Sequence, residues 1–206
     1  MYRVIRAILK IFAWIAFRME SVHLPDQRPD TPLLLCPNHQ SMLDIVAMIV
    51  TYPEPLVFVA KEELAHSVLG PIYRRLGTIF VDRDRVGMST IRSILSCMEK
   101  NQPVVIFPEG TRVKEVDPAN MKEGVSFIAQ KSGAALLPVY IEADYRFRGR
   151  VRVHYRALLD QGPFQDLPKK DQRQALTTAL FEAIYDRKGQ RAQGDPQEKK
   201  GDGDGN

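Results

Sequence analysis

Short, uninterrupted apolar runs alternate with helix-periodic segments along most of the chain. Five such runs follow one another, at residues 33–36, 56–60, 78–81, 104–107 and 136–141. Continuous apolar runs of this length are typical of strands that are buried on both faces, as in a sheet sandwiched between helices. Residues 151–159 instead alternate polar and apolar side chains, which predicts a half-exposed strand at the edge of the sheet.

Three further segments, residues 86–100, 121–131 and 170–187, have the spacing of amphipathic helices, and Gly133 is placed to end the second of them. Strands that alternate with helices predict an α/β fold. We expect a single domain over residues 23–187, with a largely buried central sheet flanked by helices. Residues 188–206 lack large apolar side chains, which predicts a disordered tail.

The first 22 residues predict an amphipathic helix. Arg3, Arg6 and Lys10 recur at helical spacing and leave a broad apolar face that includes Trp14. The longest charge-free run, residues 11–17, is too short for a membrane span, which needs roughly 20 apolar residues. The helix either lies in the interface of an anionic bilayer, with its cations on lipid phosphates, or packs on the protein's own core. The width of the apolar face favours the first interpretation. We therefore expect a peripheral or monotopic protein at the cytoplasmic face of the cell membrane.

The composition argues against nucleic-acid binding. The net charge is +4, and residues 1–20 hold most of the excess, whereas the rest of the chain has no basic cluster with stacking aromatic residues. Cys36 and Cys97, the two cysteines, lie in apolar or helical patterns, so we interpret them as buried thiols of a reducing compartment.

Polar clusters follow directly after four of the five apolar runs. NHQSMLD follows LLLCP, KEE follows LVFVA, DRDR follows TIFV, and PEGTR follows VVIF. In open α/β sheets, ligands bind beyond the carboxyl ends of strands, where loops from several strands converge. One site built from these clusters would combine a histidine, carboxylates, a lysine and arginines, which suits acid/base chemistry on an anionic substrate.

His39 and Asp44 lie in the first cluster, five positions apart. Ser41 and Asp44 precede an apolar segment in the pattern of a capping box, so one interpretation makes Asp44 only the polar start of a helix. A turn at Ser41 would also aim Asp44 back at His39. A carboxylate on one imidazole nitrogen raises the basicity of the other, which makes the pair a general base in the second interpretation. Cys36 and His39 have C-x-x-H spacing, but no second pair of zinc ligands is suitably placed.

The cluster FPEGTR predicts an anion-binding turn. Gly110 permits a tight turn, while Glu109, Thr111 and Arg112 supply an acceptor, a hydroxyl and a planar fork that can clamp phosphate. Two more cations follow predicted strands and would add positive charge to the same site, namely Lys61 and Arg83.

Four blocks of the sequence together resemble the signatures of glycerolipid acyltransferases. NHQSMLD resembles their H-x-x-x-x-D signature, GTIFVDR the second block, FPEGTR the third and LLPVYI the fourth. KEEL followed by GPIYRRLG is typical of the lysophosphatidic acid acyltransferase branch. The blocks occur in order over residues 33–141.

The resemblance implies transfer of an acyl group from acyl-CoA or acyl-carrier protein to the sn-2 hydroxyl of 1-acylglycerol-3-phosphate, which gives phosphatidic acid. It implies that His39 is the general base and Asp44 orients it, and that Pro138 and Val139 line the acyl or thioester region. It also implies an acceptor and phosphate site made of Arg83, Glu109, Gly110, Thr111 and Arg112, with Lys61 as a further ligand. No metal or redox cofactor is expected, because a thioester is already activated.

Two alternatives stay open at this point. The acceptor could be another lysolipid, such as a lyso-ornithine lipid, on which the same chemistry would act. In a different class, the protein could bind anionic lipid through residues 1–20 without catalysing a reaction.

Overall fold

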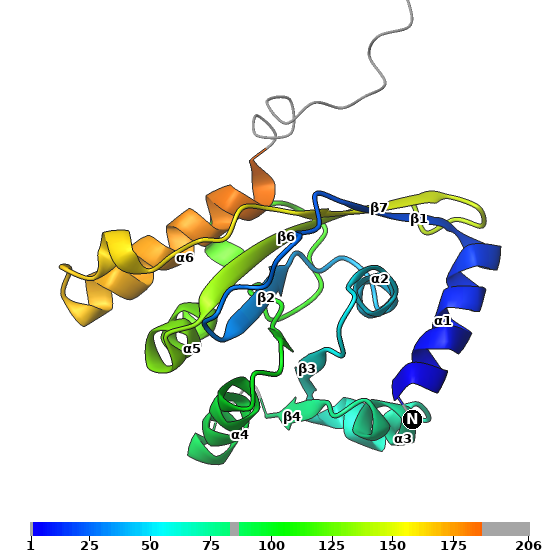
Figure 1. Cartoon of the computed structure of the whole chain (residues 1–206), viewed down its shortest axis with the longest axis horizontal. Helices are drawn as coiled ribbons and strands as arrows, with labels where there is room; N and C mark the ends of the chain where they lie inside the picture. The colour runs from blue at the N-terminus through cyan, green and yellow to red at the C-terminus, as the bar shows by residue number, and fades with distance from the viewer. Residues whose placement is uncertain (1, 83–86, 187–206) are drawn as a thin grey trace, which may run out of the picture.

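A seven-stranded sheet runs through the protein, with helices on both of its faces (Figure 1). The computed structural model describes residues 2–82 and 87–186. The strand order is β1-β7-β6-β2-β5-β3-β4, and every neighbouring pair is parallel except β6 and β7. The strands are β1 (Arg18–Val22), β2 (Leu33–Pro37), β3 (Val57–Lys61), β4 (Ile79–Val81), β5 (Val104–Val105), β6 (Ala135–Ala143) and β7 (Arg150–Tyr155).

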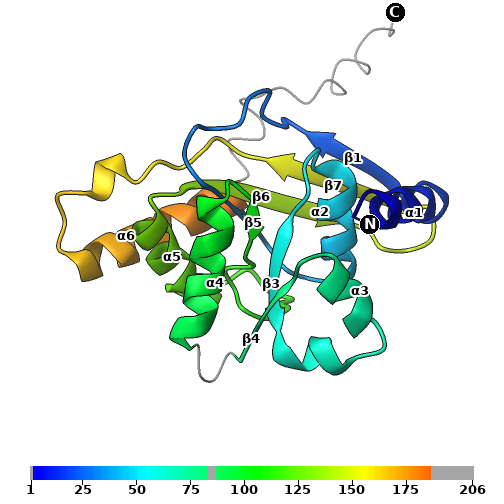
Figure 2. The same cartoon turned by 60° about the horizontal axis from the view of Figure 1, so that its bottom comes forward.

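Helices α1, α2 and α3 lie on one side of the sheet and α4, α5 and α6 on the other (Figures 1 and 2). The α-helices are α1 (Tyr2–Ala16), α2 (Leu43–Thr51), α3 (Gly70–Arg75), α4 (Met88–Glu99), α5 (Gly124–Ser132) and α6 (Lys169–Tyr185). Three short 3-10 helices are η1 (Glu62–His66), η2 (Pro118–Asn120) and η3 (Gly162–Phe164). The predicted α/β architecture is confirmed.

Strand β2 shows why the apolar runs are continuous. Its side chains alternate between two cores, because successive residues of a strand point to opposite faces. Leu33 and Leu35 pack in the core under α2, whereas Leu34 and Cys36 pack in the core under α4, α5 and α6. Every residue of the strand is buried. Both faces of the sheet are covered by helices, so a polar residue in this strand would have no route to water.

The helix predictions hold with small shifts at the ends. Segments 86–100, 121–131 and 170–187 overlap α4, α5 and α6, respectively, with ends that differ by one to three residues. Gly133 ends α5 as predicted, with a φ of 65° in the left-handed region that favours glycine.

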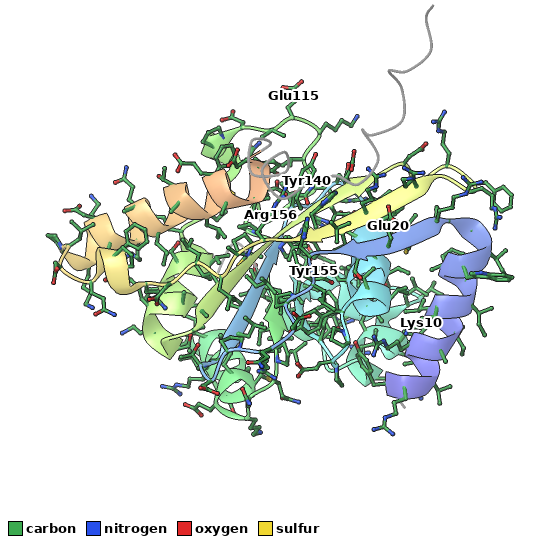
Figure 3. The ribbon with its side chains drawn as sticks, turned by 45° about the horizontal axis from the view of Figure 1, so that its top comes forward. Lys10, Glu20, Glu115, Tyr140, Tyr155 and Arg156 are labelled. Carbon is green, nitrogen blue, oxygen red and sulfur yellow. The ribbon has the colours of Figure 1, made fainter. Side chains whose placement is uncertain are left out.

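The prediction of an edge strand at residues 151–159 is wrong in its position. Strand β7 does alternate buried and partly exposed residues, but β1 pairs with its outer side, so β7 lies inside the sheet. Tyr155 of β7 packs toward α2, where its hydroxyl lies 2.9 Å from Thr51 Oγ1. Tyr140, on the neighbouring strand β6, packs on the other face of the sheet (Figure 3).

The predicted N-terminal helix is shorter than residues 1–22. It ends at Ala16, and residues 18–22 form β1 instead. Among residues 2–82 and 87–186, no helix combines the length and the apolar character needed to cross a membrane. The tail predicted at residues 188–206 lies outside the described residues.

Helix α1 has two apolar faces. One packs on the protein core, through Leu9, the fully buried Ala13 and their helical neighbours. The other is exposed, with Ile8 and Ile11 about 60% accessible and Trp14 77% accessible. The sequence predicted that Arg6 would bind lipid phosphates. Its guanidinium instead donates to the backbone carbonyls of residues 52 and 53. The interpretation as a helix packed on the core therefore holds for one face, and the bilayer interpretation stays a prediction for the exposed face.

Candidate active site

The functional residues gather where parallel strands end together. Strands β2, β5, β3 and β4 are neighbours and run in the same direction, so the loops after them meet at one edge of the sheet. Strand β2 ends at Pro37, and Asn38 continues its pairing through the side chain. Its Oδ1 accepts the Ile141 N–H at 2.6 Å, and its Nδ2 donates to the Ile141 carbonyl at 3.2 Å. His39 follows directly after this fixed point.

His39 and Asp44 form the predicted pair. The imidazole Nδ1 lies 2.9 Å from Asp44 Oδ2, and both side chains are almost entirely buried. The predicted turn at Ser41 is present. Ser41 N–H donates to Asp44 Oδ2 at 2.8 Å, and Ser41 Oγ accepts the N–H of Leu43 at 3.2 Å. The helix itself begins at Leu43, two residues after Ser41, so the capping contacts lie in the loop that also holds the histidine.

The Asp44 carboxylate accepts four hydrogen bonds. Oδ2 accepts from His39 Nδ1 and from the backbone N–H groups of Gln40 and Ser41, and Oδ1 accepts from the Tyr145 hydroxyl. These donors offset the cost of removing a fully buried carboxylate from water. Because an oxygen that already accepts two N–H groups cannot donate, Nδ1 must carry the imidazole proton. The lone pair is then on Nε2, as a general base requires.

Three further contacts hold His39. Its ring stacks on Phe107, with centroids 4.0 Å apart and planes 26° apart. Its backbone N–H donates to Glu109 Oε2 at 2.7 Å, and its carbonyl accepts the N–H of Val113 at 2.9 Å. The histidine loop is therefore attached directly to the FPEGTR turn that the sequence placed at the same edge.

Glu109 supports the histidine more directly than the sequence indicates. It is 2% accessible, and both of its oxygens have protein partners: the backbone of His39 and the hydroxyl of Tyr185 at the end of α6. Burial raises the pKa of Glu109, although the hydrogen bonds from Tyr185 and His39 act in the opposite direction. In the structure the Glu109 carboxylate contacts the His39 backbone and Tyr185. Its contact with substrate stays a prediction.

A cavity of about 770 Å³ lies beside this turn, between α4, α5 and the ends of β3, β4 and β5. Most of its lining is apolar. Phe107 is part of the wall, so the ring under His39 also borders the cavity. Gly110 and Thr111 line it as well, and Gly110 adopts a φ of 69°, the tight turn that the sequence predicted.

The predicted anion-binding residues differ in their surroundings. Arg112 is exposed and precedes Val113, whose N–H binds the His39 carbonyl, so its backbone lies next to the histidine loop. Lys61 ends β3 at the same edge of the sheet, where it forms an ion pair with Glu63 at 2.5 Å. Arg83 lies outside the described residues.

One expectation from the resemblance changes. Pro138 and Val139 do not line the cavity, because they are buried within β6 and pair with Cys36 and Pro37 of β2. The zinc spacing does not form a site either. Cys36 is fully buried in the core, where burial raises the pKa of its thiol, while Nδ1 of His39 is bound to Asp44.

Three residues of the site were not predicted. Tyr145 and Tyr185 bind the two buried carboxylates, and Lys122 lines the cavity close to Gly110. Tyr145 lies in the polar segment after β6, and Tyr185 ends a helix, so neither stands in a motif. Lys122 could have been found from its place at the start of a predicted helix, near the FPEGTR turn in the sequence.

The chain is similar to a family of known proteins. Residues 20–142 match the family model described as Acyltransferase. The chain is 26% identical over 191 residues to the 1-acyl-sn-glycerol-3-phosphate acyltransferase of Bacillus subtilis. This alignment covers 89% of this chain and 95% of that protein. It is 34% identical over 112 residues to the protein of the same name from Helicobacter pylori. That alignment covers 52% of this chain and 47% of the relative.

One solved structure extends the comparison to the fold. The crystal structure of the 1-acyl-sn-glycerophosphate (LPA) acyltransferase PlsC from Thermotoga maritima superposes with a TM-score of 0.63 at 21% identity. The match covers 91% of this chain and 81% of that one.

Proposed function

Because the chain belongs to the acyltransferase family, we propose that it transfers a fatty acyl group from acyl-CoA or acyl-carrier protein to the sn-2 hydroxyl of 1-acylglycerol-3-phosphate, which forms phosphatidic acid. The observation that carries this proposal is the His39–Asp44 pair, with Nε2 as the basic nitrogen and with the His39 ring stacked on Phe107, which forms part of the wall of an apolar cavity. The names of the relatives support the choice of acceptor.

In the proposed reaction, His39 Nε2 removes the proton of the acceptor hydroxyl as its oxygen attacks the carbonyl carbon of the thioester. A C–O bond forms, and the C–S bond breaks when the tetrahedral intermediate collapses. The proton then passes from the imidazolium to the leaving thiolate. Asp44 holds the ring in one orientation and stabilises its charged form during this sequence. The reaction uses no metal or redox cofactor in this scheme, because the thioester supplies the activated acyl group.

The cavity suits an acyl chain, and the turn beside it suits a headgroup. Apolar side chains from α4, α5 and the strands form most of the wall, which matches a hydrocarbon chain. Arg112 is an exposed guanidinium one residue from the His39 contact, and Lys122 adds a cation at the cavity. A phosphate held there would keep the acceptor hydroxyl close to the base.

We propose a peripheral or monotopic position on the cytoplasmic face of the cell membrane, with anionic lipid as the binding surface. The exposed apolar face of α1, with Ile8, Ile11 and Trp14, supports this position. Phe147, at the turn between β6 and β7, is 78% accessible and lies beside the same end of α1, because Arg148 N–H donates to the Ala16 carbonyl. Trp14 and Phe147 would therefore enter the interface together.

The decisive test compares the wild-type protein with His39→Ala. Purified protein is given lysophosphatidic acid with a long-chain acyl-CoA or acyl-carrier protein, and phosphatidic acid is measured. We expect His39→Ala to lose about a hundred- to ten-thousand-fold in rate, the usual contribution of a general base. His154→Gln is the matched control, because it replaces a half-buried histidine of β7 that bonds to Glu142. Equal rates for wild type and His39→Ala would contradict the proposal and leave only lipid binding.

A further inference from the structure

The carboxylate of Asp44 is held from two directions. Oδ2 accepts the three hydrogen bonds from the histidine loop, which come from His39 Nδ1 and the backbone N–H groups of Gln40 and Ser41. Oδ1 accepts one hydrogen bond from a residue distant in the sequence, the hydroxyl of Tyr145, at 2.6 Å. Burial, followed by the nearby Asp44 charge, raises the pKa of Tyr145, so its hydroxyl keeps its proton and acts as a donor.

Tyr145 itself is fixed by the junction between α1 and β1. Its ring meets the edge of Phe17, with centroids 5.7 Å apart and planes at 80°. Phe17 lies between the two elements and is 6% accessible. Two backbone hydrogen bonds tie this junction to the β6–β7 turn, from Arg148 N–H to the Ala16 carbonyl at 2.6 Å and from Arg18 N–H to the Gly149 carbonyl at 2.9 Å. The position of the hydroxyl thus depends on the packing of α1.

We infer that Tyr145 is a positioning residue for acyl transfer, which fixes the Asp44 carboxylate, and through it the His39 imidazole, relative to helix α1. This inference rests on the proposed function. A carboxylate that is held through only one oxygen can rotate about its Cβ–Cγ bond, and the imidazole bonded to it follows. Because a general base must meet the acceptor proton in a narrow geometry, such rotation lowers the rate of the chemical step without weakening substrate binding.

The test is Tyr145→Phe, which removes the hydroxyl and keeps the ring that packs on Phe17. We expect kcat to fall by about tenfold or more, with the KM for the acceptor unchanged within twofold. Tyr155→Phe is the matched control, because it removes another buried tyrosine hydroxyl, bonded to Thr51, from the next strand. That variant should lose similar thermal stability and keep the wild-type kcat. A kcat for Tyr145→Phe within twofold of wild type would overturn the inference.

A double-mutant cycle separates positioning from a general structural effect. If Tyr145 acts only through Asp44, adding Tyr145→Phe to Asp44→Asn should change the residual rate by less than twofold. Independent effects would instead multiply, and a further tenfold loss in the Asp44→Asn background would contradict the inference.

A measurement without substrate keeps this inference distinct from the proposed function. The His39 Nδ1 proton can be followed by proton NMR, with His39→Ala to assign its signal. We expect its exchange with water to be several times faster in Tyr145→Phe than in wild type or Tyr155→Phe. Unchanged exchange would count against the positioning role. A wild-type protein that acylates no lysolipid would overturn the proposed function, while the exchange experiment would still decide the role of Tyr145.

Discussion

Replacement of Glu109 tests whether this carboxylate supports the histidine loop or binds substrate. Its two oxygens accept the backbone N–H of His39 and the hydroxyl of Tyr185. Glu109→Ala removes both acceptors. Glu109→Gln keeps an amide oxygen for the His39 N–H and can donate its amide N–H to the Tyr185 oxygen. The pair of variants therefore separates the hydrogen bonds from the charge.

The magnitude follows from the burial of the two donors. A buried donor without a partner costs about 1–3 kcal/mol, so the two donors together should cost Glu109→Ala about 2–6 kcal/mol of unfolding free energy. For a domain of this size that corresponds to a decrease of roughly 4 to 24 °C in Tm. Its kcat should fall about tenfold or more, because the His39 backbone loses its anchor.

The charge has a different consequence, which depends on pH. Burial raises the pKa of Glu109, so the folded protein binds this proton more tightly than the unfolded chain does. The wild-type protein then loses stability as the pH rises from the ordinary carboxyl pKa through the raised one. Glu109→Gln has no such loss, and we expect it to equal the wild type in acid and to exceed its Tm above that window.

Thermal unfolding at several pH values, with kcat and KM for lysophosphatidic acid at neutral pH, completes the test. We expect Glu109→Gln to keep kcat and KM within a few-fold of wild type. If Glu109→Gln stays folded and yet raises KM as much as Glu109→Ala does, the carboxylate contacts the acceptor and the supporting role is refuted.

Two further predictions concern the headgroup and the membrane. Arg112→Ala should raise the KM for lysophosphatidic acid by about tenfold or more and have little effect with a lyso-ornithine lipid, because a charge-assisted hydrogen bond is worth about 1.5–3 kcal/mol. Lys100→Ala, an exposed cation after α4, is the control, and equal losses with both acceptors would rule out a phosphate contact. Trp14→Ala with Phe147→Ala should weaken binding to phosphatidylglycerol-containing vesicles about tenfold in flotation assays, since burying each large apolar side chain contributes about 1.5–3 kcal/mol. Leu167→Ser, which changes an exposed residue before α6, should bind like wild type, and undiminished binding of the double variant would exclude this face.

The sequence predicted what depends on local chemistry and failed where distant packing decides. The five apolar runs became strands, because only helices on both faces could bury them. The contact between His39 and Asp44 could also be predicted from local chemistry, because the turn at Ser41 that brings them together lies between them in the sequence. Residues 18–22 offered no such signal. Their side chains are mostly exposed, and β1 exists through backbone pairing with β7 and an ion pair between Glu20 and Arg152 at 2.7 Å.

The supporting tyrosines were hidden for the same reason. Tyr145 and Tyr185 lie 101 and 76 positions away from the carboxylates they bind. Tyrosine in a polar loop or at a helix end has no periodicity that indicates a partner, and its role is set by which elements the fold brings together. Glu109 was predicted as part of the site, but its motif does not reveal that both oxygens are used inside the protein.

Tyr145 and Tyr185 together explain how the two cores of the protein position His39. Tyr145 packs with the core on the α1 and α2 side of the sheet, and Tyr185 with the core under α4, α5 and α6. Each donates its hydroxyl to one carboxylate, and the two carboxylates hold different parts of His39: Asp44 its ring and Glu109 its backbone. The histidine is therefore fixed from both sides of the sheet. A repacking of either core that moves α1 or α6 would shift one of these contacts, which makes the rate of the proposed reaction sensitive to the packing of both helices.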